Sequence, residues 1–435
     1  MKDIIKQNII NKLIKGIFVL LGGIIACYIA LVLVYLLPTD IMEQHVMESR
    51  DLIEAEGISP FLLDGYPSTR LDNYSDGLIL NSAIYSGDES VWEKAAAIYQ
   101  HRYGDEDYYI SLIKHLDGIE GEITTSYERD WHGYLVYVKP LLLCMNYADI
   151  RLVNMVLQIA VVCLLLYEMY KKKIERYIPA FVMTLFFLTW NILFFSIEYS
   201  AMFYVFMTAS LWVLKKNDSI VQKRLVPELF LIVGMVVSYI DVLTYPILTI
   251  GIPLVFLFIL NREWSEDIGK IVANIATACF WWICGYGGMW AGKWVIASIV
   301  LKINVIKEAI LMALYRMSQT SGETGVLIEF TSKDVFANNF GVYAKPAYII
   351  ALVVFLIWFV RRVCKDGIEL SIRAMLPNMI IALMPVVWYL ALGNHSYIHY
   401  WMTHRNIVLI VFSICCMSIS MIKINSKDKQ RGTDD

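Results

Sequence analysis

The acidic stretch at residues 70–76 (RLDNYSD) has the residue types and spacing that a catalytic base requires. Asp72 and Asp76 are four residues apart, so they share one face if the stretch is helical; otherwise Asp72 caps a helix that begins just after it. With help from a metal ion or a hydrogen-bond donor, one carboxylate of such a pair can take a proton from an acceptor hydroxyl. The alternative is a helix cap beside a solvated acid.

A second cluster, residues 127–134 (YERDWHGY), combines an acid, an imidazole and aromatic rings. Aromatic rings beside a hydrogen-bonding imidazole can hold a sugar ring, which makes Asp130 and His132 further candidate catalytic residues. The same aromatic residues also suit the belt that membrane proteins carry at the lipid–water interface.

The third cluster, residues 394–405 (NHSYIHYWMTHR), is rich in histidine and ends in an arginine. His395 and His399 share a helix face, a spacing that can bind a metal ion or a phosphate, and Arg405 can hold a phosphate through two parallel hydrogen bonds. No Glu lies between the two histidines, so this is not the zinc-protease pattern. The alternative is an interfacial belt of aromatic and histidine residues.

Two acids lie at the edges of apolar blocks. Asp241 ends one block, where an uncompensated carboxylate is costly, so we expect it to have a partner and to bind substrate with His395, His399 and Arg405. Glu198 lies in a short turn between two blocks, where an interfacial charge without a specific role is the favoured interpretation.

The elements that must position these residues are membrane helices. The 435 residues are 58% hydrophobic and 18% charged, and their mean hydropathy is +0.56. The apolar blocks are 15 to 21 residues long and are apolar on every side, which predicts helices and excludes a β-barrel. The composition excludes a soluble enzyme, and the net charge of −3 argues against nucleic acid as a partner. Six of the eight cysteines lie within these blocks and do not form a disulfide pattern.

We predict an all-α integral membrane protein with about ten transmembrane helices and a large extracytoplasmic loop after the first. Of the 37 basic residues, 22 fall in the two ends and the alternate short loops, which places both termini in the cytoplasm and the chain in the cell membrane as a multi-pass protein. The predicted spans are 17–37, 151–170, 178–196, 200–214, 225–242, 246–261, 271–290, 347–361, 374–392 and 405–422.

The predicted spans divide the chain into six parts. The largest part outside the membrane, residues 38–150, has 21 acidic and 7 basic residues and is too long for a simple loop, so it is expected to fold as a subdomain. The parts are 1–37 (cytoplasmic tail and first span), 38–150 (extracytoplasmic subdomain), 151–290 (spans 2–7), 291–346 (extracytoplasmic interfacial segment), 347–422 (spans 8–10) and 423–435 (cytoplasmic tail). Within them, residues 90–100, 107–116 and 305–317 are expected to form short helices, and residues 318–324 a mobile loop.

This topology resembles the GT-C-type membrane glycosyltransferases. The stretches LDNYSDGLILNSA (71–83), DWHGYLVYVKPLL (130–142), SYIDVLTYPILTIGIPL (238–254) and NHSYIHYWMTHR (394–405) look similar to those of bacterial multispan proteins grouped with that class. The resemblance implies transfer of a sugar from a polyprenyl-phosphate donor, held in the membrane lipid, to an extracytoplasmic glycan or lipid acceptor.

The resemblance also implies a catalytic acid in the first outer loop, often nearer the end of the first span. Asp40 therefore competes with Asp72 and Asp76 for that role. The cofactor is undetermined, and a divalent metal ion is one option. Cations at span ends, namely Lys293, Lys302, Arg316 and Arg405, would stabilise a phosphate leaving group.

A polysaccharide polymerase or ligase, a transport protein, and a receptor or scaffold without chemistry are the alternatives. Against transport, the two halves show no recognisable repeat. A polymerase or ligase usually carries its large loop late in the chain. The feature that separates these hypotheses is whether the acids of the first loop and residues 394–405 meet in space.

Overall fold

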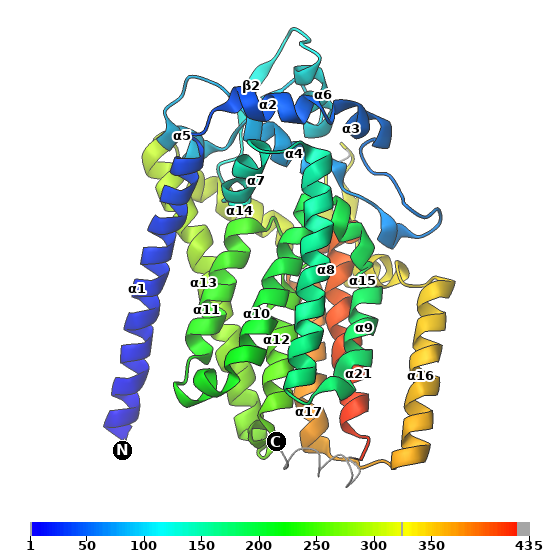
Figure 1. The fold of residues 1–435 in the computed structure, drawn as a ribbon. Helices are drawn as coiled ribbons and strands as arrows, with labels where there is room; N and C mark the ends of the chain where they lie inside the picture. Colours follow the sequence, from blue (N-terminus) through cyan, green and yellow to red (C-terminus); the bar gives the residue numbers. More distant parts are fainter. Residues whose placement is uncertain (1, 323–324, 424–435) are drawn as a thin grey trace.

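The computed structural model describes residues 2–322 and 325–423, and in it a layer of short helices covers one end of a bundle of long apolar helices (Figure 1). Helices make up most of the described chain, as the sequence predicts. The covering layer is the subdomain of residues 38–150. Its helices are α2 (Thr39–Met47), α3 (Arg50–Glu56), α4 (Asn73–Ile84), α5 (Val91–Ala97), α6 (Tyr108–Leu116) and α7 (Leu135–Leu142).

The bundle contains a helical segment at each of the ten predicted blocks. These segments are α1 (Lys2–Val34), α8 (Tyr147–Lys171), α9 (Ile178–Phe187), α10 (Ile197–Gln222), α11 (Val226–Ile240), α12 (Ile247–Leu260), α13 (Ile268–Leu301), α16 (Pro346–Asp366), α17 and α18 (Ile372–Ala382 and Met384–Ala391), and α21 (Val408–Ser420). Between α13 and α16 lie α14 (Val305–Met317) and α15 (Ser332–Gly341), and before α21 lie α19 (Gly393–Ile398) and α20 (Tyr400–Thr403).

Within the described residues, seven helical stretches are long and apolar enough to cross a membrane. They are Ile10–Val34, Tyr147–Lys171, Ile197–Gln222, Ile268–Leu301, Pro346–Asp366, Ile372–Ala391 and Tyr400–Ser420. Helices α11 and α12 are apolar but shorter, and α9 has only 10 residues. The chain is therefore an all-α membrane protein, while the count of ten crossings stays a prediction.

Two pairs of short strands lie outside the bundle. Strand β1 (Tyr99–Arg102) pairs with β2 (Ile123–Ser126), and β3 (Thr320–Ser321) pairs with β4 (Ile328–Glu329), both antiparallel. The helix expected at 90–100 therefore ends early, at Ala97, because the next residues pair with β2. The helices expected at 107–116 and 305–317 are confirmed as α6 and α14. Of the loop expected at 318–324, residues 323–324 lie outside the described residues, as does the tail 424–435.

Small residues allow α11 and α13 to cross in close contact. A Cβ atom on Gly234 would lie 2.2 Å from the carbonyl oxygen of Trp282, and one on Gly285 would lie 2.1 Å from that of Leu231. Neither position tolerates a side chain, because backbone atoms cannot move aside. Small residues at such crossings are typical of membrane helices, whose association relies on close packing.

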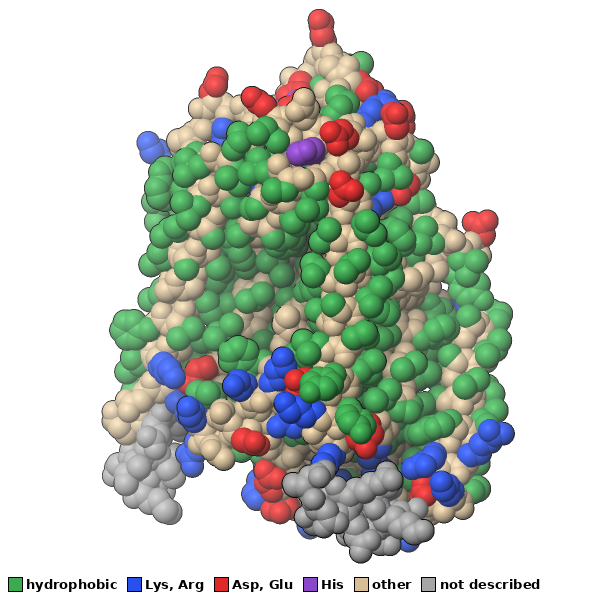
Figure 2. Space-filling view, in the orientation of Figure 1, with side chains coloured by type: hydrophobic (Ala, Val, Ile, Leu, Met, Phe, Trp, Pro, Cys, Tyr) green, Lys and Arg blue, Asp and Glu red, His purple; other side chains and the backbone are tan. Residues whose placement is uncertain are grey.

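Charge is segregated along the bundle axis. In Figure 2, Lys and Arg side chains gather at the end of the bundle away from the subdomain of residues 38–150, whereas acidic side chains are frequent over that subdomain. The first residues of α1 and the last of α21 lie at the same, basic end (Figure 1). This arrangement agrees with the loop charges from which the topology is predicted.

The predicted topology can be tested by labelling exposed positions at the two ends. With exposed Cys144 and Cys364 first replaced by serine, a membrane-impermeant maleimide added to intact cells should label Ser86→Cys in the subdomain and not Ser219→Cys at the basic end. Both positions should react after the membrane is permeabilised. Labelling of Ser219→Cys alone in intact cells would show that the orientation in the membrane is the opposite of the predicted one.

Candidate functional site

A cavity of about 620 Å³ lies where the subdomain meets the bundle. Its lining side chains come from α4, α6, α13, α14, α19 and α20 and from the loops beside them. They share a chemistry of acids, guanidinium groups, imidazoles and aromatic rings: Asp72, Asp130, Arg70, Arg129, Arg316, His395, His399, Tyr74, Tyr108, Tyr127, Trp290, Trp294 and Trp401, with apolar residues between them.

Two acids of the first loop, Asp72 and Asp130, do meet residues 394–405 here. The indole Nε1 of Trp401 donates a hydrogen bond of 3.4 Å to Oδ2 of Asp72. The guanidinium of Arg70 lies 4.4 Å from the centre of the Trp401 ring, within the range of a cation–π interaction. Two segments more than 300 residues apart in sequence therefore form adjacent parts of one wall.

Asp72 is a helix cap that also faces the cavity. Its Oδ1 accepts the backbone N–H of Ser75 at 3.2 Å, and its Oδ2 accepts the Ser75 hydroxyl at 3.0 Å. Burial raises the pKa of the Asp72 carboxyl, and the hydrogen bonds from Ser75 and Trp401 with the charge of Arg70 only partly offset that effect. The two sequence-based interpretations of Asp72, cap and candidate base, are thus compatible.

Asp130, the second acid on the cavity wall, is half-buried. Burial raises the pKa of its carboxyl, while the charges of Arg129, Lys293 and Arg316 act in the opposite direction. The backbone beside it is fixed, because Nε1 of buried Trp131 donates 2.8 Å to the carbonyl of Met289 in α13.

The two cavity histidines are uncharged at neutral pH. Nε2 of His395 lies 2.8 Å from the carbonyl oxygen of Leu243, which can only accept, so Nε2 carries the proton and Nδ1 the lone pair. Burial lowers the pKa of His395 to about 3 and holds that of His399 well below its usual value. The rings lie 4.8 Å apart, and neither Nδ1 has a hydrogen-bond partner among the described residues. Both Nδ1 atoms are buried, so a hydroxyl group could reach them only after a small rotation of the rings.

Three guanidinium groups supply the positive charge of the cavity. Arg129 forms an ion pair of 2.6 Å with Glu308 of α14, Arg316 donates to Oδ1 of Asn394 at 3.3 Å, and Arg70 donates to the Ser59 hydroxyl at 2.7 Å. Arg316 is one of the cations expected at span ends, whereas Arg70 and Arg129 were not predicted to belong to the site. Both lie within the acidic motifs, at RLD and ERD, and this position beside a candidate catalytic acid is the sequence feature that could have identified them.

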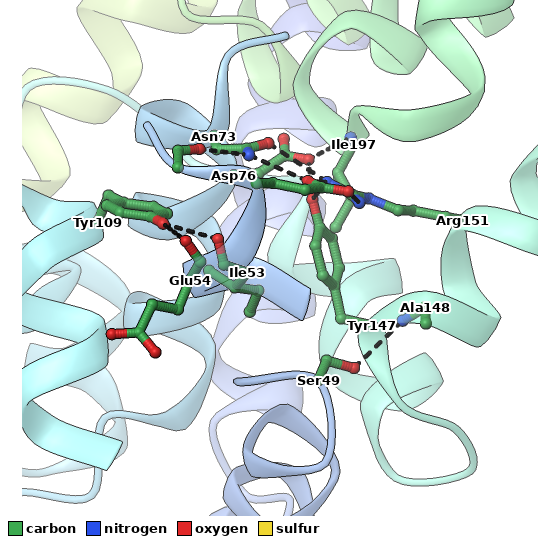
Figure 3. Close-up of polar contacts among 12 residues, drawn as sticks. Ser49, Ile53, Glu54, Asn73, Asp76, Tyr109, Tyr147, Ala148, Arg151 and Ile197 are labelled. Carbon is green, nitrogen blue, oxygen red and sulfur yellow. Dashed lines mark hydrogen bonds and ion pairs between the residues drawn. The ribbon is translucent and has the colours of Figure 1, made fainter. Parts of the chain in front are cut away.

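Asp76 lies elsewhere, among buried residues between α4, α8 and the start of α10 (Figure 3). Its carboxylate accepts the Tyr147 hydroxyl at 2.5 Å and the backbone N–H groups of Ile197 and Glu198 at 3.0 and 3.1 Å. Arg151 donates to the same Tyr147 hydroxyl at 2.9 Å. Asp76 thus caps α10 and does not belong to the described residues that line the cavity.

The remaining predicted residues support the wall from behind. His132 has a positive φ of 49° and bonds to the Tyr134 hydroxyl, and Asp241 accepts the backbone N–H of Thr244 at 3.0 Å. Arg405 donates 2.8 Å to the carbonyl of Trp401 while its guanidinium lies 3.8 Å from the Tyr199 ring centre. None of the three is among the described side chains at the cavity surface.

The other charged candidates also lie away from the cavity surface. Asp40 is exposed in the first turn of α2. Glu198 is buried at the start of α10, so it is not the solvated interfacial charge that the sequence favours. Lys293 is buried and donates to the carbonyls of Ala95 and Ala96 at the end of α5.

Gly133, which follows the tryptophan and histidine of the second cluster, lies where only a residue without a side chain fits. Its N–H donates 2.8 Å to the carbonyl of Tyr239, and a Cβ atom there would lie 2.5 Å from the Tyr239 ring. The segment after Asp130 is thereby held tightly against the end of α11.

Comparison with protein-family models, with curated proteins and with solved structures finds no match to this chain. The function must therefore be inferred from the chemistry of the cavity. Among the residues that the structure describes, no group of three or more potential metal ligands lies at that cavity.

Because Asp76 and Asp72 have different environments, replacing each by Asn should lower the stability to different extents. In Asp76→Asn, the new amide N–H₂ faces buried N–H and O–H donors, and we expect a loss of about 3 kcal/mol of stability. In Asp72→Asn, the loss should be smaller, about 1 kcal/mol, because Asn still accepts the Ser75 N–H as a helix cap and gives up only the weaker contacts of the second oxygen with Ser75 and Trp401. Thermal unfolding of the two purified variants in one detergent measures the difference, and equal unfolding temperatures would contradict the assignment.

Proposed function

We propose that the chain is a membrane glycosyltransferase that moves a sugar from a polyprenyl-phosphate donor to a glycan or lipid acceptor outside the cytoplasm. The observation that carries this proposal is the single cavity, at the end of an apolar bundle, in which two carboxylates, three guanidinium groups and six aromatic rings converge. Its volume lies within the range of about 300–1,000 Å³ typical of small-ligand sites.

The membrane-facing side of the cavity supports a donor with a lipid tail. Along α14, Ala309, Met312, Ala313 and Arg316 face the cavity. The opposite side of α14 exposes Ile310, Leu311 and Leu314, which are 47%, 57% and 59% exposed. One helix therefore separates the cavity from an apolar surface suited to lipid. A donor could place its prenyl chain against that surface and its sugar phosphate within the cavity.

The charged groups have separate roles in this proposal. Arg70, Arg129 and Arg316 bind the phosphate and stabilise it as it leaves. Of the four cations expected from the sequence in this role, Lys293, Lys302, Arg316 and Arg405, only Arg316 is among the described residues that line the cavity. Arg405 instead positions Trp401 through its carbonyl. The rings of Trp290, Trp294 and the cavity tyrosines pack against the sugar, and His395 and His399 accept hydrogen bonds from its hydroxyl groups.

Asp72 is the general base in the proposed reaction. The acceptor oxygen attacks the anomeric carbon, the bond from that carbon to the phosphate oxygen breaks, and polyprenyl phosphate leaves with the bonding electrons. The acceptor proton passes to Asp72, whose orientation is fixed by Ser75 and Trp401 and whose raised pKa favours accepting it. Asp130 offsets part of the charge of the arginines.

The rest of the topology belongs to the same proposal. Ten crossings with both termini in the cytoplasm place the subdomain and the cavity on the outer side of the cell membrane. Polyprenyl-phosphate sugars and envelope acceptors would meet at that face. The acidic surface of the subdomain and the basic opposite end support this orientation (Figure 2).

The base assignment predicts a large loss of turnover in a folded variant. Asp72→Asn should reduce sugar transfer by about a hundredfold, because it removes the proton acceptor and keeps the helix cap. The measurement is transfer of labelled sugar from a lipid extract by purified protein. Asp64→Asn, an exposed acid of the same subdomain, serves as the matched control and should keep full activity.

Four outcomes would contradict the base assignment or the proposed function. Full turnover in Asp72→Asn excludes it as the base. Loss of turnover in Asp130→Asn alone would assign the general base to Asp130. Loss of turnover in Asp40→Asn alone would assign it to Asp40. Absence of transfer from every lipid-linked donor by the wild-type protein would refute the proposed function.

The phosphate assignment predicts a change in donor affinity. Arg316→Gln removes one cation and keeps a donor toward Asn394, so the donor KM should rise by about tenfold or more while kcat changes less. Arg361→Gln, at the basic end of α16, should leave both constants unchanged. Equal constants for wild type and Arg316→Gln would exclude Arg316 from donor binding.

A further inference from the structure

Two histidines and a glutamate meet in the subdomain at a point that takes no part in the cavity. His101 belongs to β1, His115 to the last turn of α6, and Glu122 directly precedes β2. One potential ligand atom from each side chain lies within 4.8 Å of the others. Three separate elements therefore bring a metal-binding set of ligands to one place.

The two imidazoles are parallel and share one carboxylate. Their ring centres lie 3.7 Å apart with 14° between the planes. Nδ1 of His115 is 2.7 Å from Oε2 of Glu122, and Nδ1 of His101 bonds to the other oxygen, Oε1. Both Nδ1 atoms thus point to the same side. Tetrahedral Zn²⁺ needs ligand atoms roughly 3.4 Å apart, and Glu122, about one-third exposed, has room to move outward to that spacing.

The outer ring nitrogen of His115 has the carboxylate neighbour that a metal-binding histidine uses. Nε2 of His115 lies 3.6 Å from Oε1 of Glu43, an acceptor. In a neutral imidazole whose Nδ1–H donates to Glu122, Nε2 carries a lone pair, so two acceptors would face each other. When Nδ1 binds a metal, the proton moves to Nε2, which then becomes a donor toward Glu43. Metal-binding histidines typically have such a carboxylate partner.

His101 is the most deeply buried of the three side chains. His101 is only 4% exposed, and its Nε2 is buried without a partner among the described residues.

We propose that His101, His115 and Glu122 bind one Zn²⁺ ion, with water as the fourth ligand. Imidazole and carboxylate ligands with two neutral donors suit Zn²⁺ better than Mg²⁺ or Ca²⁺, which prefer oxygen ligands alone. The proposal is independent of the transfer reaction, since none of the three residues lines the cavity.

The ion would stabilise the cavity wall from behind. Helix α6 begins with Tyr108 and ends near His115, while β2 leads directly into Tyr127; both tyrosines line the cavity. Arg102, beside His101 in β1, lies 4.5 Å from the Tyr108 ring centre. A zinc ion joining β1, α6 and the start of β2 would therefore fix the position of these two rings.

Metal content tests the proposal without any activity measurement. Full-length protein in detergent, equilibrated with buffered Zn²⁺ and separated from free metal, should contain about one zinc per chain by elemental analysis. Glu122→Gln should bind zinc at least tenfold more weakly, and it should stay folded because Gln still accepts a hydrogen bond. His101→Asn should have the same effect. The control variant His395→Asn/His399→Asn, which changes only the cavity histidines, should keep its zinc.

A second measurement reports the ion in the wild-type protein. Glu120 is exposed in the loop between α6 and β2. Bound zinc should slow cleavage after Glu120 by a glutamate-specific protease by about tenfold, because metal binding stabilises the folded conformation of this loop. Zinc should not slow this cleavage in the Glu122→Gln variant. Absence of zinc from the wild-type protein, retention of zinc by both ligand variants, or its loss only in the cavity double variant would each overturn the proposal.

Discussion

The carboxylate of Asp76 satisfies backbone N–H groups that would otherwise be buried without partners. Helix α10 begins beneath the subdomain, where water cannot reach its first N–H groups, and every helix start has such groups to satisfy. Because Asp76 is part of α4, this bond fixes α4 over α10 and sets the position of Asp72 one turn earlier. The contact of Asp72 with Trp401, and with it the wall of the cavity, depends on that placement.

The cavity concentrates charges of both signs at the end of an apolar bundle. Three guanidinium groups face two carboxylates, while both histidines remain neutral and add no further positive charge. The arginines are restrained by Glu308, Asn394, Ser59 and the Trp401 ring, so they are oriented before any ligand binds. Groups oriented in advance do not need to reorganise when a negatively charged ligand enters.

The sequence reveals the helices because apolar length alone determines them, and all ten predicted blocks are helical. It also groups Asp72, Asp76, Asp130, His132, His395, His399 and Arg405 into one expected site. The structure places Asp72, Asp130, His395 and His399 at the cavity, whereas the other three are not among its described lining residues. It could not separate Asp72 from Asp76, since these acids differ only through Tyr147 and Ile197, which lie 71 and 121 residues away. Arg70 and Arg129 were missed because a surface arginine and a cavity arginine look alike in sequence. His101, His115 and Glu122 follow no standard metal-binding spacing, so only the fold brings them together.

Helix α16 stands apart from the rest of the bundle in Figure 1, and its apolar side chains are exposed along nearly all of its 21 residues. It is held mainly at its ends. Near its start, the Tyr348 hydroxyl bonds to Ser68 and Thr189; just beyond its end, Ile368 pairs with Ile422. A helix of this length spans about 31 Å, close to the hydrocarbon thickness of a bilayer. Since Ser68 is two residues from Arg70, any tilt of α16 in a membrane of mismatched thickness would act on a contact close to the cavity wall.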